Sequence, residues 1–276
     1  MYLVGLGGKR PTAQSSCVEH ESKIDEKELD LIHRDAGRSL LYRYYSRPEP
    51  EGSSSGELSP RTPSGQLTSQ IARSFSEMQH ELANVLERCV SEPFGRNQSK
   101  LHYYQGLHEL AGVLMYNLTD QDLTLSVLRR ICQSHLRDAL REDFDGLSWL
   151  LSYIVPPLIE MFDEEVFQFL VESEVSISNC VLPWIITWFA HDVKDAQVAS
   201  RLVDAFLCAH PLFPVYFVVA LLLHPLNRPD ILSSECDQAM VHMTMLTFAP
   251  RISGDWDDPR TNVTAQCLLD QAVAFM

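Results

Sequence analysis

The chain has 276 residues, of which 45% are hydrophobic, enough to bury the core of one large domain or two small ones. This composition excludes a largely disordered protein. With a formal net charge of −15, most of the surface would repel a phosphate backbone, so we expect no nucleic acid partner.

The first part of the chain alternates between irregular and helical patterns. Residues 1–24 show no periodicity, and we expect them to be disordered. Over residues 25–45, apolar side chains recur at three-to-four spacing and predict an amphipathic helix. Residues 46–66 are rich in Ser, Pro and Gly and predict a flexible insertion, because they cannot bury enough apolar surface to offset the entropy of ordering. The helical period returns over residues 68–91.

The rest of the chain predicts a packed array of helices. The helical segments are 101–118, 122–141, 147–162, 164–172, 179–190, 195–209, 213–224, 235–247 and 262–275. Thr119 and Asp122 have the spacing of a capping box. Asp163 and Asp195 each stand where a helix N-cap is expected. No alternation typical of strands appears, so the predicted fold class is all-α.

The apolar residues predict a buried core rather than a membrane span. The longest apolar stretch, residues 205–223, is interrupted by His210, Pro211 and Pro214 and is too short to cross a bilayer. We predict a buried helix there. Large aromatic side chains at helical spacing are also predicted to lie in the core, namely Trp149, Tyr153, Trp184, Trp188 and Phe189.

The cysteines indicate a reducing compartment. There are seven of them, without a CxxC pair and odd in number, which argues against a disulfide framework or a zinc site. The first ten residues lack the apolar region of a secretory signal. We therefore expect reduced, mostly buried thiols in a cytoplasmic protein.

Signatures of conventional enzymes and metal sites are incomplete. Residues 5–10 resemble a phosphate loop but lack its first Gly and the Ser or Thr after Lys9. Residues 52–56 match GxSxG but lie inside the Ser-rich run, with no strand before them. His108-Glu109 and His191-Asp192 lack companion ligands, so we expect helix-surface or capped polar residues and no metal.

Two short segments are informative when they are taken together. Residues 32–38 read Ile-His-Arg-Asp-Ala-Gly-Arg, which places Asp35 and Arg38 three positions apart on one helix, where they can pair. Alone, such a pair is usually a solvated surface ion pair. Residues 101–110 surround Gln105 with tyrosines and a glycine, and alone they would indicate a helix start with packing tyrosines.

In this order, the IxxDxxR pattern, the Tyr-Gln-Gly pattern and the Trp-containing segment 184–191 resemble the TBC family of Rab GTPase-activating proteins. The resemblance extends over roughly residues 26–247 and implies a multi-helix TBC domain over residues 25–276. Within the family, segments such as 102–108 and 210–217 are most similar to the branch, with fungal members, that acts on the Rab of early secretory traffic.

The resemblance implies a catalytic activator of a Rab-family GTPase rather than a free-standing enzyme. It implies that Arg38 enters the GTPase site as an arginine finger, held by Asp35, and that Gln105 substitutes for the GTPase's own Gln. Tyr104 and Gly106 would support the loop around Gln105, with simple core and turn roles as the alternative. No cofactor is implied, since the GTPase carries GTP and Mg²⁺. The expected location is cytoplasmic, peripheral at ER or Golgi membranes, without a membrane-spanning segment.

The chain also departs from the family pattern. Little sequence precedes Ile32, and the Arg-x-x-x-Trp-Pro segment of the family is missing, so we expect an incomplete N-terminal part. Arg38 and Gln105 are 67 positions apart, with residues 46–66 as an insertion whose closure costs little entropy. The alternatives are a non-catalytic Rab-binding scaffold and an unrelated helical interaction module.

Overall fold

The computed structural model describes residues 24–39, 75–91, 101–254, 257–258 and 260–276. The helices are α1 (Glu26–Arg38), α4 (Phe75–Ser91), α5 (Leu107–Asn117), α6 (Gln121–Ser134), α7 (Asp145–Phe162), α8 (Glu164–Glu172), α9 (Ile177–Thr187), α10 (Ala196–Cys208), α11 (Phe213–Leu223), α12 (Arg228–Ser233), α13 (Gln238–Leu246) and α14 (Ala265–Phe275). A 3₁₀ turn, η1 (Ala249–Arg251), precedes β1 (Ile252–Ser253), which pairs in parallel with β2 (Val263–Thr264). The predicted all-α class is confirmed, apart from this short ladder, which was not predicted.

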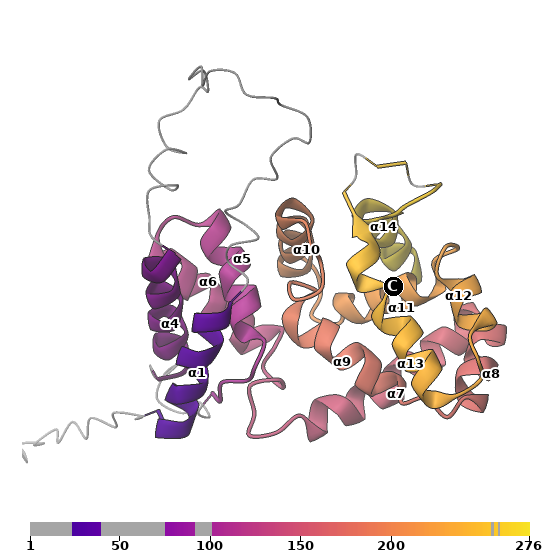
Figure 1. Ribbon diagram of the computed structural model, residues 1–276, viewed down its shortest axis with the longest axis horizontal. Coiled ribbons are helices and arrows are strands. Elements are labelled where there is room, and N and C mark those ends of the chain that lie inside the picture. The colour runs from indigo at the N-terminus through magenta and orange to yellow at the C-terminus, as the bar shows by residue number, and fades with distance from the viewer. Residues whose placement is uncertain (1–23, 40–74, 92–100, 255–256, 259) are drawn as a thin grey trace, which may run out of the picture.

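Two groups of helices meet in the middle of the molecule. Helices α1, α4, α5 and α6 lie at one end, α7 to α9 and α11 to α14 at the other, and α10 between them (Figure 1). Within the first group, α1 packs against α4 and α5. The groups join where α5 contacts α9 and α10. The turn before α5, which carries Gln105, therefore lies at the boundary between them.

Helix α11 forms the centre of the second group. It is apolar on all sides and almost wholly buried because α14, α7 and α9 pack against it. An aromatic cluster lies beside it, with every member at most 1% exposed: Trp184, Trp188, Phe189, Phe206 and Phe217. Several of these rings meet edge to face, with centroids 5.0 Å apart for Phe189 and Phe217, whereas Trp184 stacks on Phe189. The predicted core helix and the core positions of Trp184, Trp188 and Phe189 are confirmed.

The core prediction for Trp149 and Tyr153 is wrong. Their residues are 61% and 62% exposed, and the two rings contact each other on the outer face of α7 with centroids 4.3 Å apart. The buried face of α7 carries Leu147, Leu151 and Val155 instead. Residues four positions apart share one face of a helix, but this spacing does not say which face is buried.

Helix caps follow the predictions in part. The carboxylate of Asp163 accepts from the Val166 N–H of α8 at 3.1 Å, and that of Asp195 accepts from the Gln197 N–H of α10 at 2.7 Å. Both N-caps are confirmed. The capping box at Thr119 is wrong, because Asp120 caps α6 by accepting from the Leu123 N–H at 2.7 Å.

Some predicted boundaries also differ. The helix predicted over 122–141 ends at Ser134, and turns occupy the residues that follow. The short helix α12 was not predicted. Four predictions fall wholly or partly outside the described residues: the disorder of residues 1–24 apart from residue 24, the insertion 46–66, and parts of the segments 25–45 and 68–91.

Three further findings concern thiols, metals and membranes. The cysteines in the described part of the chain are free: Cys89, Cys132 and Cys180 are buried, Cys267 is half-buried, and Cys208 and Cys236 are exposed.

Among the described residues, no cluster of three or more His, Cys, Asp or Glu side chains could hold a metal ion. Over the same residues no single helix is long and apolar enough to cross a membrane, although α8 and α9, bent by 113°, pass that test as a pair by length and composition.

Candidate functional site

Arg38 lies at the C-terminal end of α1, where a buried carboxylate holds it. The buried face of α1 consists of Ile32, Asp35 and Ala36, whereas the side chain of Arg38 is 56% exposed. Nη2 of Arg38 donates to Oδ1 of Asp35 at 2.5 Å, and the Asp35 side chain is fully buried. This pair therefore differs from a solvated surface pair, because one partner is fixed in the core and orients the exposed guanidinium.

Asp35 also fixes the segment that precedes α5. The hydroxyl of Tyr103 donates to Oδ2 of Asp35 at 2.9 Å, and the backbone N–H of Tyr103 donates to Oε1 of Glu28 at 2.5 Å. Burial and the negative charge of Asp35 raise the pKa of Tyr103 well above its ordinary value, so its hydroxyl keeps its proton. Two bonds thus join α1 to a segment some seventy residues further along the chain.

Gln105 lies at the tip of the turn that begins α5, between two fixed neighbours. Tyr104 is buried, its hydroxyl donates to the carbonyl oxygen of Ile186 in α9 at 2.6 Å, and its ring meets the edge of Phe144. Gly106 follows as the N-cap of α5 with φ 118°. Gln105 itself is exposed, and within the described residues no hydrogen bond engages its carboxamide.

We expect Gly106→Ala to destabilise the domain by about 1–3 kcal/mol, measured by urea unfolding. A side chain at φ 118° is strained, and the added Cβ would stand 3.0 Å from Cγ2 of Thr187. The matched control is Gly37→Ala, where no atom lies within 4 Å of the added Cβ. Because alanine is favoured over glycine inside a helix, the control should be neutral or stabilising. Equal destabilisation of the two variants would contradict this explanation.

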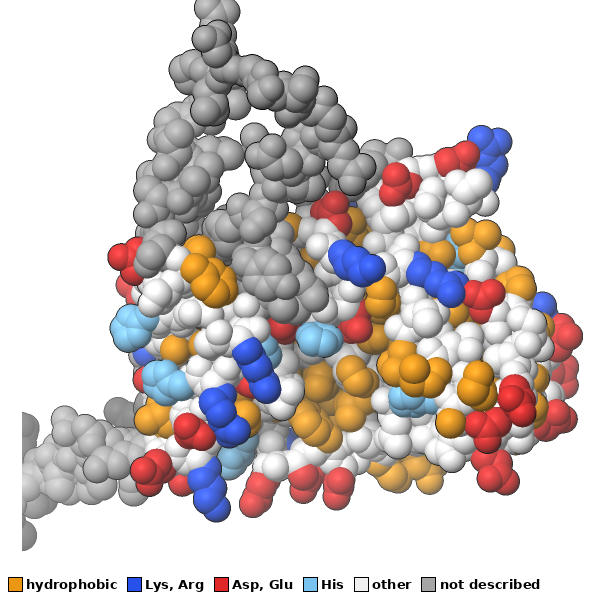
Figure 2. All heavy atoms as spheres, in the orientation of Figure 1, with side chains coloured by type: hydrophobic (Ala, Val, Ile, Leu, Met, Phe, Trp, Pro, Cys, Tyr) orange, Lys and Arg blue, Asp and Glu red, His pale blue; other side chains and the backbone are white. Residues whose placement is uncertain are grey.

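Arg38 and Gln105 line one pocket of about 500 Å³ at the junction of α1, α5 and α9. The lining residues are Arg38, Gln105, Gly106, His108, Glu109, Pro183, Ile186, Thr187 and His191. Figure 2 shows one face of the molecule. Hydrophobic side chains gather at its centre, beside α9, and histidine and basic side chains lie next to them toward α1. The structure therefore brings the two finger candidates to one opening, together with Gly106, while Asp35 and Tyr104 support them from beneath.

Glu109 lies buried in this pocket between two histidines. Its Oε1 is 3.3 Å from Nε2 of His108 and 3.5 Å from Nδ1 of His191. Burial by itself would raise the pKa of Glu109, but hydrogen bonds and positive charge from the two imidazoles outweigh burial and lower it to about 2. His108 and Glu109 do not lie on the helix surface, since both are buried, whereas His191 is 58% exposed.

We expect the carboxylate of Glu109 to stabilise the fold at neutral pH and to lose this effect in acid. Its folded-state pKa of about 2 lies below the ordinary value of 4.5, so the stabilisation is complete above pH 4.5 and falls as the pH approaches 2. The full contribution is about 3 kcal/mol, of which about 2 kcal/mol is lost by pH 3. Urea unfolding of the wild type and Glu109→Gln from pH 6 to pH 3 measures it, since the difference between them should shrink on acidification.

The matched control for this titration is Glu87→Gln, which removes a carboxylate that pairs with exposed His33 at 2.9 Å. Exposed pairs contribute little to stability, so the difference between the wild type and this variant should change little with pH. A Glu109→Gln difference that stays constant from pH 6 to pH 3 would refute the role of its charge.

Comparison with known proteins now identifies the family. The family model of the Rab-GTPase-TBC domain matches residues 58–232, more than half of the chain. The chain belongs to the Rab-GTPase-TBC domain family. The match includes Gln105 and the α9 wall of the pocket of this TBC domain, whereas Arg38 precedes the matched residues.

Individual relatives agree with this assignment. TBC1 domain family member 20 of Bos taurus is 34% identical over 165 residues, 60% of this chain and 38% of the relative. GTPase-activating protein gyp10 of Schizosaccharomyces pombe is 34% identical over 147 residues, 53% of this chain and 38% of the relative. The chain thus spans 38% of the length of these two curated relatives. The predicted resemblance to this branch is confirmed.

A solved structure supports the fold. The crystal structure of the Chlamydomonas flagellar RabGAP TBC domain aligns with a TM-score of 0.51 at 13% sequence identity, covering 91% of this chain and 73% of that chain. At this identity the similarity concerns the fold of the TBC domain alone.

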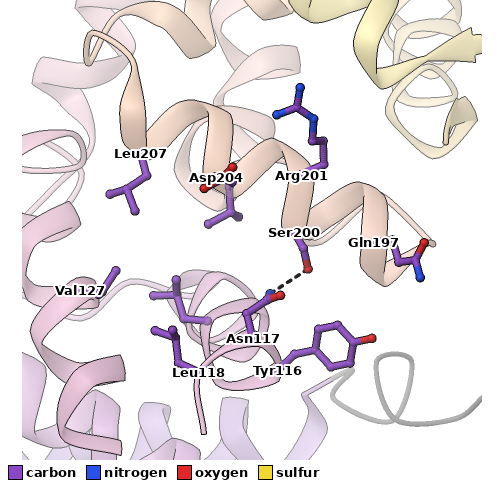
Figure 3. A pocket seen from close by; sticks show the side chains of 11 residues that line it. Tyr116, Asn117, Leu118, Val127, Gln197, Ser200, Arg201, Asp204 and Leu207 are labelled. Carbon is purple, nitrogen blue, oxygen red and sulfur yellow. Dashed lines mark hydrogen bonds between the residues drawn. The ribbon is translucent and has the colours of Figure 1, made fainter. Parts of the chain in front are cut away.

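A second pocket of the TBC domain, of about 600 Å³, lies between the end of α5 and α10. Figure 3 shows Leu118, Val127 and Leu207 around it, and Asn117 of α5 pointing toward Ser200 of α10. The Nδ2 atom of Asn117 donates to Oγ of Ser200 at 2.8 Å. This pocket contains none of the site residues predicted from the sequence and marks where the two helix groups are joined.

Sequence reasoning missed the parts of the site that act through burial. Tyr103 was read only as a packing tyrosine, and His108, Glu109 and His191 were set aside because their spacing matches no metal motif. Tyr103, His108 and Glu109 are buried polar residues in contact with one another or with Asp35. A signal was present in His108 and Glu109, two ionisable residues in the first turn of a helix that is otherwise mostly apolar.

Proposed function

We propose that this TBC domain accelerates GTP hydrolysis on a Rab-family GTPase, with Arg38 and Gln105 reaching the bound nucleotide. The observation that carries the proposal is that these two side chains, from distant parts of the chain, are both exposed at one pocket. Family membership and relatives that include a protein named as a GTPase-activating protein support the Rab partner. Resemblance to this branch favours a Rab of early secretory traffic.

The guanidinium of Arg38 would act electrostatically. During phosphoryl transfer, charge gathers on the oxygens around the γ-phosphate, and a planar cationic fork can donate two hydrogen bonds to it. Asp35 keeps the guanidinium at the rim of the pocket before docking, so less conformational freedom is lost on binding. Because the pair is only partly buried, the guanidinium can leave the carboxylate for the nucleotide.

The carboxamide of Gln105 would orient water. An amide both donates and accepts, so one side chain can accept a hydrogen bond from the attacking water while it donates to a phosphate or backbone oxygen. Fixed neighbours on each side hold the turn, through the Tyr104 bond to Ile186 and the Gly106 cap. GTP and Mg²⁺ would be carried by the GTPase, so the domain itself needs no cofactor.

Single-turnover GTP hydrolysis on a panel of Rab GTPases tests the proposal. The wild-type domain should accelerate at least one Rab of early secretory traffic over its intrinsic rate. Binding to a GTP-loaded Rab without acceleration would favour the non-catalytic scaffold instead, an alternative suggested by the position of Arg38 before the residues that match the family model. Absence of both binding and acceleration would favour an unrelated helical interaction module.

A further inference from the structure

A chain of polar contacts runs beneath the pocket from Arg38 to His191. Arg38 pairs with Asp35, and Oδ2 of Asp35 is 3.7 Å from Nδ1 of His108. Nε2 of His108 faces Glu109 at 3.3 Å, and Glu109 faces Nδ1 of His191 at 3.5 Å. The inner members are buried, whereas the two ends are exposed and line the same pocket. His191 thus occupies, at the far end, a position equivalent to that of Arg38.

The backbone before His191 is strained in a way that brings this residue to the pocket. Trp188 and Phe189 adopt left-handed conformations, with φ 51° and 64°, and both are almost fully buried. Such a conformation costs about 1 kcal/mol or more for each bulky residue and persists only where the surrounding packing enforces it. The turn ends α9 and returns the chain to Glu109 in α5. These two strained residues are separated from His191 only by Ala190, so the turn that they form sets where His191 enters the pocket.

We propose that His191 is a third side chain with which the domain contacts the docked GTPase, donating a hydrogen bond to an anionic oxygen beside the nucleotide. The inference rests on the proposed function and extends it. The Glu109 carboxylate faces Nδ1 of His191 at 3.5 Å and orients the imidazole at the rim of the pocket. On a chain with a net charge of −15, Arg38 supplies local positive charge at the opening that His191 also lines, where an anionic group must approach.

Two sources could provide this oxygen: the transferring phosphoryl group or a carboxylate of the GTPase. Aluminium fluoride bound beside GDP mimics the transferring phosphoryl group. Binding measured with and without it therefore distinguishes the two sources of the oxygen. If the phosphate is the acceptor, His191→Ala should weaken binding to the GDP-bound Rab only when aluminium fluoride is present. If a carboxylate is the acceptor, His191→Ala should weaken binding by the same factor with and without aluminium fluoride.

The test uses the Rab that the wild-type domain accelerates most, and measures kcat/KM together with these affinities. Loss of one hydrogen bond to a charged group corresponds to about tenfold or more, so His191→Ala should lower kcat/KM by that factor. His191→Gln keeps a hydrogen-bond donor in place of the imidazole, so its kcat/KM should lie between those of the wild type and His191→Ala. The matched control is His33→Ala, since His33 is 52% exposed and pairs with Glu87 but does not line the pocket.

The outcomes separate this inference from the proposed function. Acceleration by the wild type with His191→Ala equal to His33→Ala would overturn the role of His191 and leave the proposed function standing. If the wild type binds Rabs but accelerates none, the proposed function fails, and a loss of affinity in His191→Ala alone would still support the contact. Absence of binding to every Rab would overturn both.

Discussion

Replacing Arg38 with alanine should lower the stimulated rate of GTP hydrolysis by about 10³-fold or more, toward the intrinsic rate of the GTPase. The guanidinium is the strongest positive charge at the pocket, and its loss leaves the charge that develops on the γ-phosphate without its bidentate donor. Arg38 is exposed and ends its helix, so the fold should survive the change. Single-turnover hydrolysis at saturating domain concentration measures the effect.

Two further variants test whether the loss of rate in Arg38→Ala comes from the guanidinium of Arg38 at the pocket. Arg38→Lys keeps the charge but not the planar fork, and should recover little of the lost rate. Arg34→Ala is the matched control, because Arg34 lies on the same helix, is 64% exposed and pairs with an exposed carboxylate, that of Asp30, but does not line the pocket. Full activity of Arg38→Ala, or an equal loss in Arg34→Ala, would show that Arg38 is an ordinary surface residue.

Replacing Gln105 with alanine should slow the stimulated reaction by about 10²- to 10³-fold, the usual effect of removing one preorganised hydrogen-bonding group from a transition state. Gln105 is exposed, so stability should be unchanged. Because its carboxamide is proposed to replace that of the GTPase, the wild-type domain should still accelerate a Rab whose own catalytic Gln is changed to Leu. Single-turnover hydrolysis with the two forms of the Rab tests both statements.

Gln168→Ala serves as the control for this pair of measurements, since Gln168 is exposed on α8 and does not line the pocket. It should behave as the wild type with both forms of the Rab. A Rab that ceases to respond once its own Gln is replaced would show that the GTPase, and not Gln105, orients the water.

The fold could be predicted from the sequence because it depends on patterns repeated over many residues. The apolar period located α7 and a continuous apolar run located α11, and Asp163 and Asp195 marked two helix starts, where they form N-cap bonds. The period does not say which of two apolar faces is covered when a helix lies at the surface. That is why Trp149 and Tyr153 were assigned to the core and are exposed.

The sequence predicts which residues form the candidate site, but it does not predict which buried residues hold them in place. The Asp35 and Arg38 spacing lies within one helix turn, so their pairing follows from local geometry. The bond from Tyr103 to Asp35 and the contact between Glu109 and His191 join residues from different elements, and only packing brings them together. Burial of Glu109 likewise depends on how α5 meets α9, which no local pattern encodes.

A double-mutant cycle on Arg38 and Gln105 tests most directly whether these two side chains act together on one nucleotide. Single-turnover GTP hydrolysis is measured with the wild type, Arg38→Ala, Gln105→Ala and the double variant on the same Rab. When two side chains stabilise one transition state as a unit, the effects of removing them on the rate are not additive in free energy. The double variant should therefore be little slower than Arg38→Ala alone. An unchanged rate in either single variant, or two losses that simply multiply, would contradict the account.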